Sequence, residues 1–425
     1  MPSPEARAAF AADAAASDCL SCGGHGLEPI LDLGPMPLSN GFLEEADLAR
    51  PEERFPLRLA FCPRCSLAQL LETPGARAIF GADYPYFSSF TDGLIAHARD
   101  NALALIASRA LGPDSLVAEI ASNDGYMLTA FSEAGIPVIG IDPAPGPAEV
   151  ARKKGIETVV DFFGTRVAAE LQARGLRADV LIANNVVPHV DDPNDLVAGM
   201  AALLAPDGVA SVEFAYIGDL IERGEFDTIY HEHRCYFSLH AAKHLFERHG
   251  LTVNDVRRLP IHGGSLRLTL SRKPDRSEAV ETLLEEERRA GIDSPRFYRS
   301  FGDRVRRFRT QALERIASLK ADGRRLAAYG AAAKGTIMLN FLGLSGDTVE
   351  YAVDRNTYKQ DKYIPGVRIP IRSPEVLCQD RPDYVLLLPW NIREEIVAQQ
   401  RAYLAGGGRF ILPRPGLEII GDADA

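Results

Sequence analysis

Four cysteines near the N-terminus are the residues whose types and spacing point most clearly to chemistry. They form two Cys-x-x-Cys pairs, Cys19 with Cys22 and Cys62 with Cys65. Two thiolates at this spacing can bind one metal ion from a tight turn, and two such turns complete the tetrahedral sulfur set that Zn²⁺ prefers. Four protein ligands leave no open position for a substrate, so we predict a structural zinc site. The alternative is free or redox-active thiols, but a catalytic pair would need only one motif at the start of a helix.

A second candidate site lies in VAEIASNDGY, residues 117–126. The segment predicts a strand with Glu119 near its end, followed by a loop in which Gly125 opens the next helix. Such a loop lets the backbone approach the methionine part of S-adenosylmethionine (SAM). The next strand ends in Asp142, at the distance where an acid commonly accepts hydrogen bonds from both ribose hydroxyls.

The alternative for this segment is a dinucleotide-binding unit, which shares the acid but expects G-x-G-x-x-G. The sequence Ala-Ser-Asn-Asp-Gly does not supply that pattern, so the motif favours SAM over NAD. The candidate cofactor-binding residues are Glu119, Ala121, Asn123, Gly125, Asp142, Asn184 and Asn185.

A dense polar cluster, IYHEHRCYF at 229–237, follows the fifth apolar run of the central region. The loops after parallel strands are where an α/β sheet places its active site. Polar side chains seldom cluster merely to fill a core, and here four follow one another: Tyr230, His231, Glu232 and His233. Their spacing excludes a metal site of the HExxH type. Histidines that cap a helix or lie exposed remain the structural alternative. His189, after the fourth run, is expected at the same rim.

The elements that must position these residues form an alternating pattern. Short apolar runs lie at 115–125, 137–143, 156–163, 179–187 and 208–214. Helix-length segments separate them, which is typical of βαβ units and a parallel sheet buried on both faces. After a helical stretch at 240–250, the runs LTVNDVRRL and GGSLRLTLS are joined by a short turn. We expect them to form an antiparallel pair at the sheet edge.

The C-terminal third shows a second α/β pattern. Residues 276–320 are charged and predict amphipathic helices that bridge domains. RLAAYGAAAKG, starting at 325, predicts a strand, a glycine turn and a helix, and VEYAVD, DYVLLLP and GRFILP predict further parallel strands. Lys334 in this turn resembles a phosphate-binding residue at a helix N-terminus, although an ordinary turn would leave it merely exposed.

The chain is therefore predicted to be an α/β protein in three parts. The expected boundaries are 1–17 for a frayed or weakly helical, flexible tail, 18–72 for the zinc-binding domain, 73–275 for a SAM-binding, Rossmann-like domain, and 276–425 for C-terminal helices with a Rossmann-like domain.

Composition limits the partners. The chain has 425 residues, of which 46% are hydrophobic and 25% charged, with a formal net charge of -11. The acidic balance argues against nucleic acid as a partner. No run approaches the ~20 apolar residues that cross a bilayer, which argues against a membrane. The N-terminus lacks the pattern of a secretory signal, so we expect a cytoplasmic protein.

These motifs occur in one order: the cysteine pairs, EIASNDG, NNVVPHV, IYHEH, HGGSLR and YGAAAKG. With them the sequence resembles the family of SAM-dependent sugar C-methyltransferases, from residue 18 to about 415. The resemblance implies the same three domains, of which the central one, 73–275, is a class I methyltransferase domain that depends on SAM. It also implies a nucleotide-linked 4-keto-deoxyhexose as substrate, in the biosynthesis of unusual sugars such as those of antibiotics.

The resemblance also implies roles for individual residues. It makes His233 the general base, with Tyr230 and Glu232 lining the sugar pocket, and it places His189 and Tyr84 at the same pocket. The sequence departs from the family pattern at Ala121, where glycine is usual, and at Pro188 before the histidine.

The expected reaction is methylation of a carbon next to a ketone, after a base removes the adjacent proton. Two alternatives remain open at this point. One is a methyltransferase of the same fold with an oxygen, nitrogen or non-sugar carbon acceptor. The other is a non-catalytic, zinc-containing binding or scaffold protein. The sequence indicates neither the sugar nor the oligomeric state.

Overall fold

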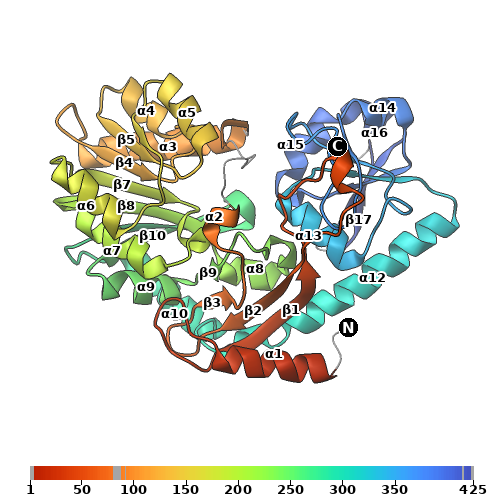
Figure 1. Ribbon diagram of the computed structural model, residues 1–425, viewed down its shortest axis with the longest axis horizontal. Coiled ribbons are helices and arrows are strands. Elements are labelled where there is room, and N and C mark those ends of the chain that lie inside the picture. Colours follow the sequence, from red (N-terminus) through yellow and green to blue (C-terminus); the bar gives the residue numbers. More distant parts are fainter. Residues whose placement is uncertain (1–3, 80–87, 91, 414–415, 423–425) are drawn as a thin grey trace.

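The computed structural model describes residues 4–79, 88–90, 92–413 and 416–422. Within them the strands form three sheets, of four, seven and six strands. Figure 1 shows the seven-stranded sheet with its helices on the left, the six-stranded sheet with its helices on the right, and the small sheet below and between them. The predicted α/β architecture of a small module and two Rossmann-like domains is confirmed.

The small sheet contains the cysteine pairs and has the order β1-β2-β3-β9. Its strands are β1 (Glu28–Met36), β2 (Phe55–Phe61), β3 (Ala68–Leu70) and β9 (Cys235–Tyr236), all paired antiparallel. Three of these strands come from the N-terminal region, whereas β9 comes directly after the IYHEH motif. A short helix, α2 (Ala76–Ile79), ends this part of the chain.

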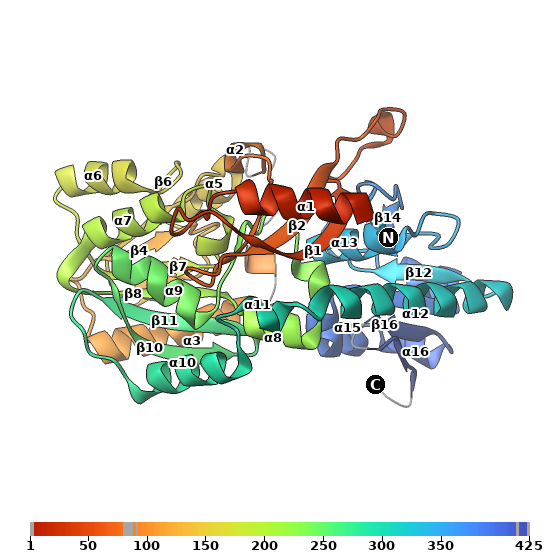
Figure 2. The same cartoon turned by 90° about the horizontal axis from the view of Figure 1, so that it is seen from below.

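The N-terminal segment differs from the flexible tail expected over 1–17. Residues Pro4–Ala16 form helix α1, which lies along the small sheet in Figure 2. Phe10 and Ala14 are buried in the main core. Because residues four apart share one face of a helix, these two side chains together dock α1 on β1. Alanine also favours the helix itself.

The central sheet has the order β10-β11-β8-β7-β4-β5-β6. Its strands are β4 (Val117–Ile120), β5 (Val138–Ile141), β6 (Thr158–Val159), β7 (Ala178–Asn184), β8 (Leu204–Ala215), β10 (Thr252–Leu259) and β11 (Ser265–Ser271). The first five are parallel to one another. The antiparallel pair β10 and β11 lies at the edge beside β8, as predicted.

Both faces of this sheet are buried. In β7, Val180 and Ile182 belong to one apolar cluster, whereas Leu181 and Ala183 belong to the other. Alternate residues of a strand point to opposite faces, so helices must cover each side. These helices are α3 (Asp92–Arg109), α4 (Leu128–Glu133), α5 (Pro145–Lys153), α6 (Thr165–Ala173), α7 (Pro193–Leu203), α8 (Ile217–Arg223) and α9 (Leu239–Arg248).

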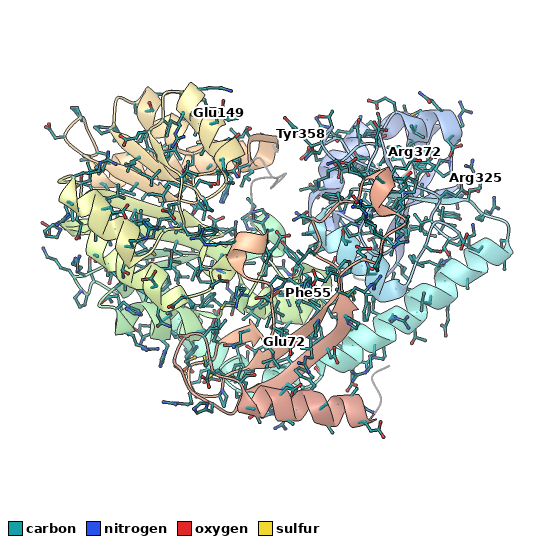
Figure 3. All side chains as sticks on the ribbon, viewed as in Figure 1. Phe55, Glu72, Glu149, Arg325, Tyr358 and Arg372 are labelled. Atoms are coloured by element: carbon teal, nitrogen blue, oxygen red, sulfur yellow. The ribbon has the colours of Figure 1, made fainter. Side chains whose placement is uncertain are left out.

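The C-terminal sheet has the order β14-β13-β12-β15-β16-β17, parallel except for β17. Its strands are β12 (Leu326–Tyr329), β13 (Ala352–Val353), β14 (Ile371–Arg372), β15 (Tyr384–Leu387), β16 (Arg409–Leu412) and β17 (Glu418–Ile420). Its helices are α13 (Ala333–Leu342), α14 (Val376–Asp380), α15 (Arg393–Gln399) and α16 (Arg401–Ala405). Arg325, labelled in Figure 3, directly precedes β12 and pairs with Glu350 and Asp380 at 2.6 and 2.7 Å.

The helices that connect the two large sheets along the chain pack against different domains. Helix α10 (Glu278–Ala290) packs on the central domain, where its buried Glu287 accepts hydrogen bonds from the first amides of α9. After the short α11 (Pro295–Tyr298), helix α12 (Phe301–Ala321) passes β1 and reaches α13 (Figure 2). The predicted bridge between domains is thus α12. In the described part of the chain, no helix is long and apolar enough to cross a membrane.

Candidate active site

The loop after β4 has the backbone shape expected of a cofactor-binding loop. Ala121, Asn123 and Gly125 all have positive φ, of 54, 50 and 74°. A Cβ at Gly125 would lie 2.5 Å from Cδ1 of Ile156, so only glycine fits there. Three left-handed residues in five turn the chain back at the carboxyl end of β4, which is where open α/β sheets bind ligands.

Three buried carboxylates surround this loop: Glu119, Asp124 and Asp142. Asp142 accepts hydrogen bonds from the backbone amides of Asn123 and Ala144, each at 2.8 Å. Burial nevertheless raises the pKa of Asp142 to about 6. Burial and the two neighbouring carboxylates raise the pKa of Glu119 well above its ordinary value.

The three buried carboxylates around the loop after β4 fit a cationic ligand that carries hydrogen-bond donors. Within the described residues, Oε2 of Glu119, both carboxylate oxygens of Asp124 and Oγ of Ser122 are buried without a hydrogen-bond partner. Nζ of Lys154 lies 3.6 Å from the carboxylate of Asp124. SAM carries an ammonium group, a sulfonium and two ribose hydroxyls, which match this surplus of buried acceptors and negative charge.

Asn184 and Asn185 lie beside the same loop. Strand β7 pairs with β4, with Ala183 opposite Ile120, so both strands end at one edge. The side-chain nitrogen of Asn184 lies 3.2 Å from Sδ of Met127. The backbone of Asn185 has a φ of 53°. The structure therefore brings all seven predicted cofactor residues to the carboxyl ends of β4, β5 and β7.

Binding of SAM is expected to depend on pH through Asp142. A carboxylate with a pKa of about 6 is about one-tenth ionised at pH 5. If the ionised form binds the ribose, the dissociation constant measured by calorimetry should be about tenfold higher at pH 5 than at pH 7.5. The same raised pKa destabilises the ligand-free protein as pH rises from about 4 to about 6, so the stabilisation by SAM should grow over that range.

Asp142→Asn should flatten this pH dependence and weaken binding by about 10- to 100-fold, since a charge-assisted hydrogen bond is lost. The matched control is Asp179→Asn, because Asp179 binds the amide of Leu116 at the opposite end of the strands. Equal pH dependence in the wild type and in Asp142→Asn would contradict the assignment.

Ala121 is expected to be strained. A left-handed backbone costs a non-glycine residue ~1–2 kcal/mol, while glycine loses ~0.5–1 kcal/mol more entropy on folding. Ala121→Gly should therefore raise the free energy of unfolding by up to ~1 kcal/mol in urea titrations. Ala118→Gly, in the regular part of β4, should lower it instead. A clear loss of stability in Ala121→Gly would refute this account.

The IYHEH motif lies in a segment that we call the His233 loop, residues 225–236. It contains a single helical turn, Phe226–Thr228, and ends in β9. Nδ1 of His233 lies 2.9 Å from the carbonyl oxygen of Thr228. A carbonyl can only accept, so Nδ1 carries the proton and Nε2 keeps its lone pair. The geometry therefore presents Nε2 as a base.

Aromatic side chains gather around His233. The ring of Tyr230 lies against it with centroids 4.0 Å apart, and the ring of His189 meets it edge-on at 4.7 Å. His189 ends the short turn Val187–His189 after β7. The amide of Arg234 donates to the carbonyl of Pro188 at 2.7 Å, which fastens the two segments together.

Both imidazoles are neutral at physiological pH. Burial, followed by the charge of His189, lowers the pKa of His233 well below its ordinary value. Burial lowers the pKa of His189 to about 4. A neutral His233 can accept a proton, and a second neutral ring beside it does not repel the product of that transfer.

The other two motif residues contact the zinc-binding module. Nε2 of His231 lies 3.1 Å from the carbonyl of Pro56, and its ring packs edge-on against Phe55, labelled near the centre of Figure 3. Asn40 donates a hydrogen bond of 2.7 Å to Glu232, whose pKa burial raises to about 7. His231 thus anchors the motif to the zinc-binding module, and Glu232 accepts a hydrogen bond from Asn40 of that module. Tyr84 lies outside the described residues.

The C-terminal domain fastens the other end of the His233 loop. Phe226 packs against Phe341 with ring centroids 4.8 Å apart. The indole nitrogen of Trp390 donates to Asp227 at 2.7 Å, and Lys334 lies over the same indole at 4.6 Å. All three domains therefore meet at this loop.

Sequence reasoning missed three residues here: Asn40, Trp390 and His262. Asn40 and Trp390 reach the loop only through the tertiary fold, so no local pattern identifies them. His262 has a φ of 58°, and burial lowers its pKa to about 4, with a further contribution from the charge of Lys334. In the sequence, the available signal for His262 was its place in the motif HGGSLR. In the structure, the signal is its strained backbone, which often marks a functional site.

The four N-terminal cysteines form the metal-binding group that the sequence predicts. Their sulfur atoms all lie within 4.8 Å of one another, with Cys19 to Cys65 at 3.4 Å and Cys22 to Cys62 at 3.6 Å. A tetrahedron with zinc–sulfur bonds of ~2.3 Å has sulfur atoms about 3.8 Å apart, so the group fits Zn²⁺. In each pair the residue after the second cysteine, Gly23 or Ser66, takes a positive φ, which closes the two turns alike. With four protein ligands the site is structural.

Comparison with protein families gives three matches along the chain. A zinc binding domain matches residues 19–80, a methyltransferase domain residues 95–256, and the C-terminal domain of C-methyltransferases residues 260–415. The C-methyltransferase NovU of Streptomyces niveus is 38% identical over 406 residues, covering 95% of this chain and 96% of NovU.

Other similarities are partial. A ubiquinone biosynthesis O-methyltransferase of Actinobacillus pleuropneumoniae serotype 5b is 32% identical over 103 residues, covering 22% of this chain and 42% of that enzyme. Among solved structures, magnesium protoporphyrin IX methyltransferase of Synechocystis PCC 6803 with bound SAH has a TM-score of 0.35 at 18% identity, covering 46% of this chain and 92% of that one. A SAM-dependent methyltransferase of Thermotoga maritima has a TM-score of 0.33 at 18% identity, over 44% and 96%.

Proposed function

Because the chain belongs to the family of SAM-dependent C-methyltransferases, we propose that it methylates the carbon next to the ketone of a nucleotide-linked 4-keto-deoxysugar. One observation carries the proposal. His233 is neutral and has its Nδ1 proton bound to the carbonyl of Thr228, which leaves Nε2 available to remove a proton from carbon. A carbon acceptor next to a ketone becomes nucleophilic only after such a base removes its proton.

In the proposed reaction, Nε2 of His233 takes a proton from the carbon beside the ketone, and the electron pair of that bond forms the enolate. The Thr228 carbonyl, which accepts from Nδ1, stabilises the positive charge that the ring then carries. When bound, SAM supplies a methyl group on a positively charged sulfur, and the carbon–sulfur electron pair leaves with the sulfur. Positioning the two reactants in line is worth up to ~7–11 kcal/mol.

The enolate oxygen needs hydrogen-bond donors before the methyl group arrives. Tyr230 and His189, whose rings contact His233, are the proposed donors together with Tyr84. We assign Glu232 to the wall of the sugar pocket, where its raised pKa of about 7 leaves it partly protonated and able to donate.

The nucleotide end of the substrate is assigned to the C-terminal domain, on the strength of a repeated backbone motif. Asp354, directly after β13, accepts hydrogen bonds from the amide of Ala331 in the loop after β12 and from the amide of Asn356, both at 2.8 Å. Asp142 accepts the same two kinds of hydrogen bond. One comes from the amide of Asn123, in the loop after the preceding strand β4, and the other from the amide of Ala144, two residues after Asp142. A ribose-binding loop of this kind, followed by Lys334 at the start of α13, suits the ribose and the diphosphate of a nucleoside diphosphate.

The test of this function uses purified enzyme, labelled SAM and a panel of 4-keto-sugar nucleotides beside the matching 4-hydroxy compounds. We expect methylated product, identified by mass, only with the ketones, together with exchange of the adjacent proton in D₂O. Methylation of a compound without a ketone, and without proton exchange, would favour an oxygen or nitrogen acceptor instead. The domain limits, the cytoplasmic location and the absence of nucleic-acid or membrane partners stay predictions.

A further inference from the structure

The zinc-binding sheet is completed by the His233 loop itself. In its fourth strand, Cys235 and Tyr236 of β9 pair with Gln69 and Ala68 of β3. The amide of Leu70 also donates to the carbonyl of Arg234 at 2.9 Å. The contacts between β3 and the His233 loop therefore begin at Arg234, the residue directly after His233. Any displacement of β3 must therefore move the backbone that carries this imidazole.

Gln69 joins β3 to the first cysteine turn. Gln69 is 2% exposed. Its Oε1 accepts from the amide of Leu20 at 2.8 Å, and its Nε2 donates to the carbonyl of Asp18 at 3.0 Å. Asp18 and Leu20 flank the metal ligand Cys19. One buried amide group thus binds both sides of a zinc ligand from the strand that holds β9.

The same cysteine turn is docked on the central domain. Asn194, the second residue of α7, donates to the carbonyls of Leu20 and Ser21 at 2.8 and 3.1 Å. Arg248 of α9 also donates to the carbonyl of Ser21. Helix α7 begins just after the turn that ends in His189. The backbone acceptors of this metal-bound turn are therefore contacted from β3, which pairs with β9, and from α7, which follows the His189 turn.

We propose that the zinc-binding module braces the His233 loop, and that Gln69 is a positioning residue through which the metal-bound turn fixes His233. The metal orders the turn whose amide and carbonyl groups Gln69 binds, because structural zinc sites couple metal binding to local folding. The expected effect on rate rests on the proposed function of His233, whereas the expected ordering of the loop does not.

The experiment measures hydrogen exchange by mass spectrometry in the full-length, zinc-loaded protein and in Gln69→Met, which keeps the side-chain volume but loses both hydrogen bonds. In the peptide spanning residues 229–237, we expect exchange about tenfold faster in the variant, since opening of the loop becomes easier. The reported amides include those of His233 and Arg234, which bind the carbonyls of Tyr230 and Pro188. Zinc content and the affinity for SAM should be unchanged.

The matched control is Gln172→Met. Gln172 also donates from a partly buried amide to a backbone carbonyl, that of Ala202 at 2.5 Å, but it lies in α6, away from the small sheet. Gln69→Glu is a second disrupting variant, because a buried carboxylate can accept from Leu20 but is repelled by the carbonyl oxygen of Asp18. We expect exchange in this variant to be at least as fast as in Gln69→Met.

Unchanged exchange at residues 229–237 in zinc-loaded Gln69→Met would overturn the proposal, as would an equal increase throughout the central sheet. We also expect a lower kcat, by ~10- to 100-fold, with KM changed less, because misplaced catalytic groups slow the chemical step. Faster exchange with an unchanged kcat would support the brace and would count against His233 as the base. The two ideas therefore fail separately.

Discussion

Replacing His233 with asparagine is expected to lower the rate of methyl transfer by ~10²- to 10⁴-fold, the usual contribution of a general base. Asparagine can still donate to the carbonyl of Thr228, so the loop should keep its shape. The affinity for SAM should change little, because the acidic loop at Glu119 and Asp142 belongs to other strands. Product formation and exchange of the substrate proton in D₂O measure the two steps.

Both activities should fall together in this variant, since no base remains to form the enolate. His25→Asn is the control, because His25 is exposed and pairs with Asp18 at the surface. In the wild type, the low pKa of His233 should move the acid limb of the pH profile of kcat/KM below pH 6.5, as the ring stays neutral to lower pH. Full retention of both activities in His233→Asn would remove this residue from the role.

Replacing Cys62 with serine is expected to abolish zinc binding and to unfold the small sheet. Structural zinc sites contribute ~10–16 kcal/mol of apparent binding free energy in zinc-finger peptides, so the loss of one thiolate removes most of the stability of so small a module. We expect zinc content, measured by atomic absorption, to fall from one ion per chain to nearly none. The thermal midpoint should fall with it.

The control for this variant is Cys378→Ser, because Cys378 is an exposed cysteine of the C-terminal domain. It should keep both the zinc ion and the wild-type midpoint. A Cys62→Ser protein with a full complement of zinc would show that the four sulfur atoms do not form one site. The purified variant should also lose methyltransferase activity, since β9 loses its partner strand.

Much of the fold was predictable because its signals are local. The apolar runs at 137–143 and 179–187 correspond to β5 and β7, and the pair after residue 250 forms the antiparallel edge. The ends of the strands were less predictable. Strand β7 stops at Asn184, because Asn185 takes a positive φ and Pro188 follows in a turn. The family recognised from the motifs is confirmed by the match to NovU.

The unpredicted parts depend on contacts between distant residues. Strand β9 has two residues and no strand pattern of its own, and it forms because β3 offers an open edge. Helix α1 is held by the burial of Phe10 and Ala14 and by its packing on β1, a contact that no local pattern indicates. The meeting of Asn40 with Glu232 likewise joins domains. Sequence analysis therefore identified the polar residues of the loop but not the contacts that hold the loop in place.

The pairing of Gln69 with Cys235 has a consequence for biosynthesis on the ribosome. Strand β3 emerges roughly 165 residues before its partner β9, which at ~5–20 residues per second is a delay of about 10 to 30 s. During that interval the nascent small sheet exposes an unpaired edge, the kind of surface that invites aggregation or chaperone binding. Early metal capture by the cysteines would then protect a half-finished molecule long before its catalytic centre exists.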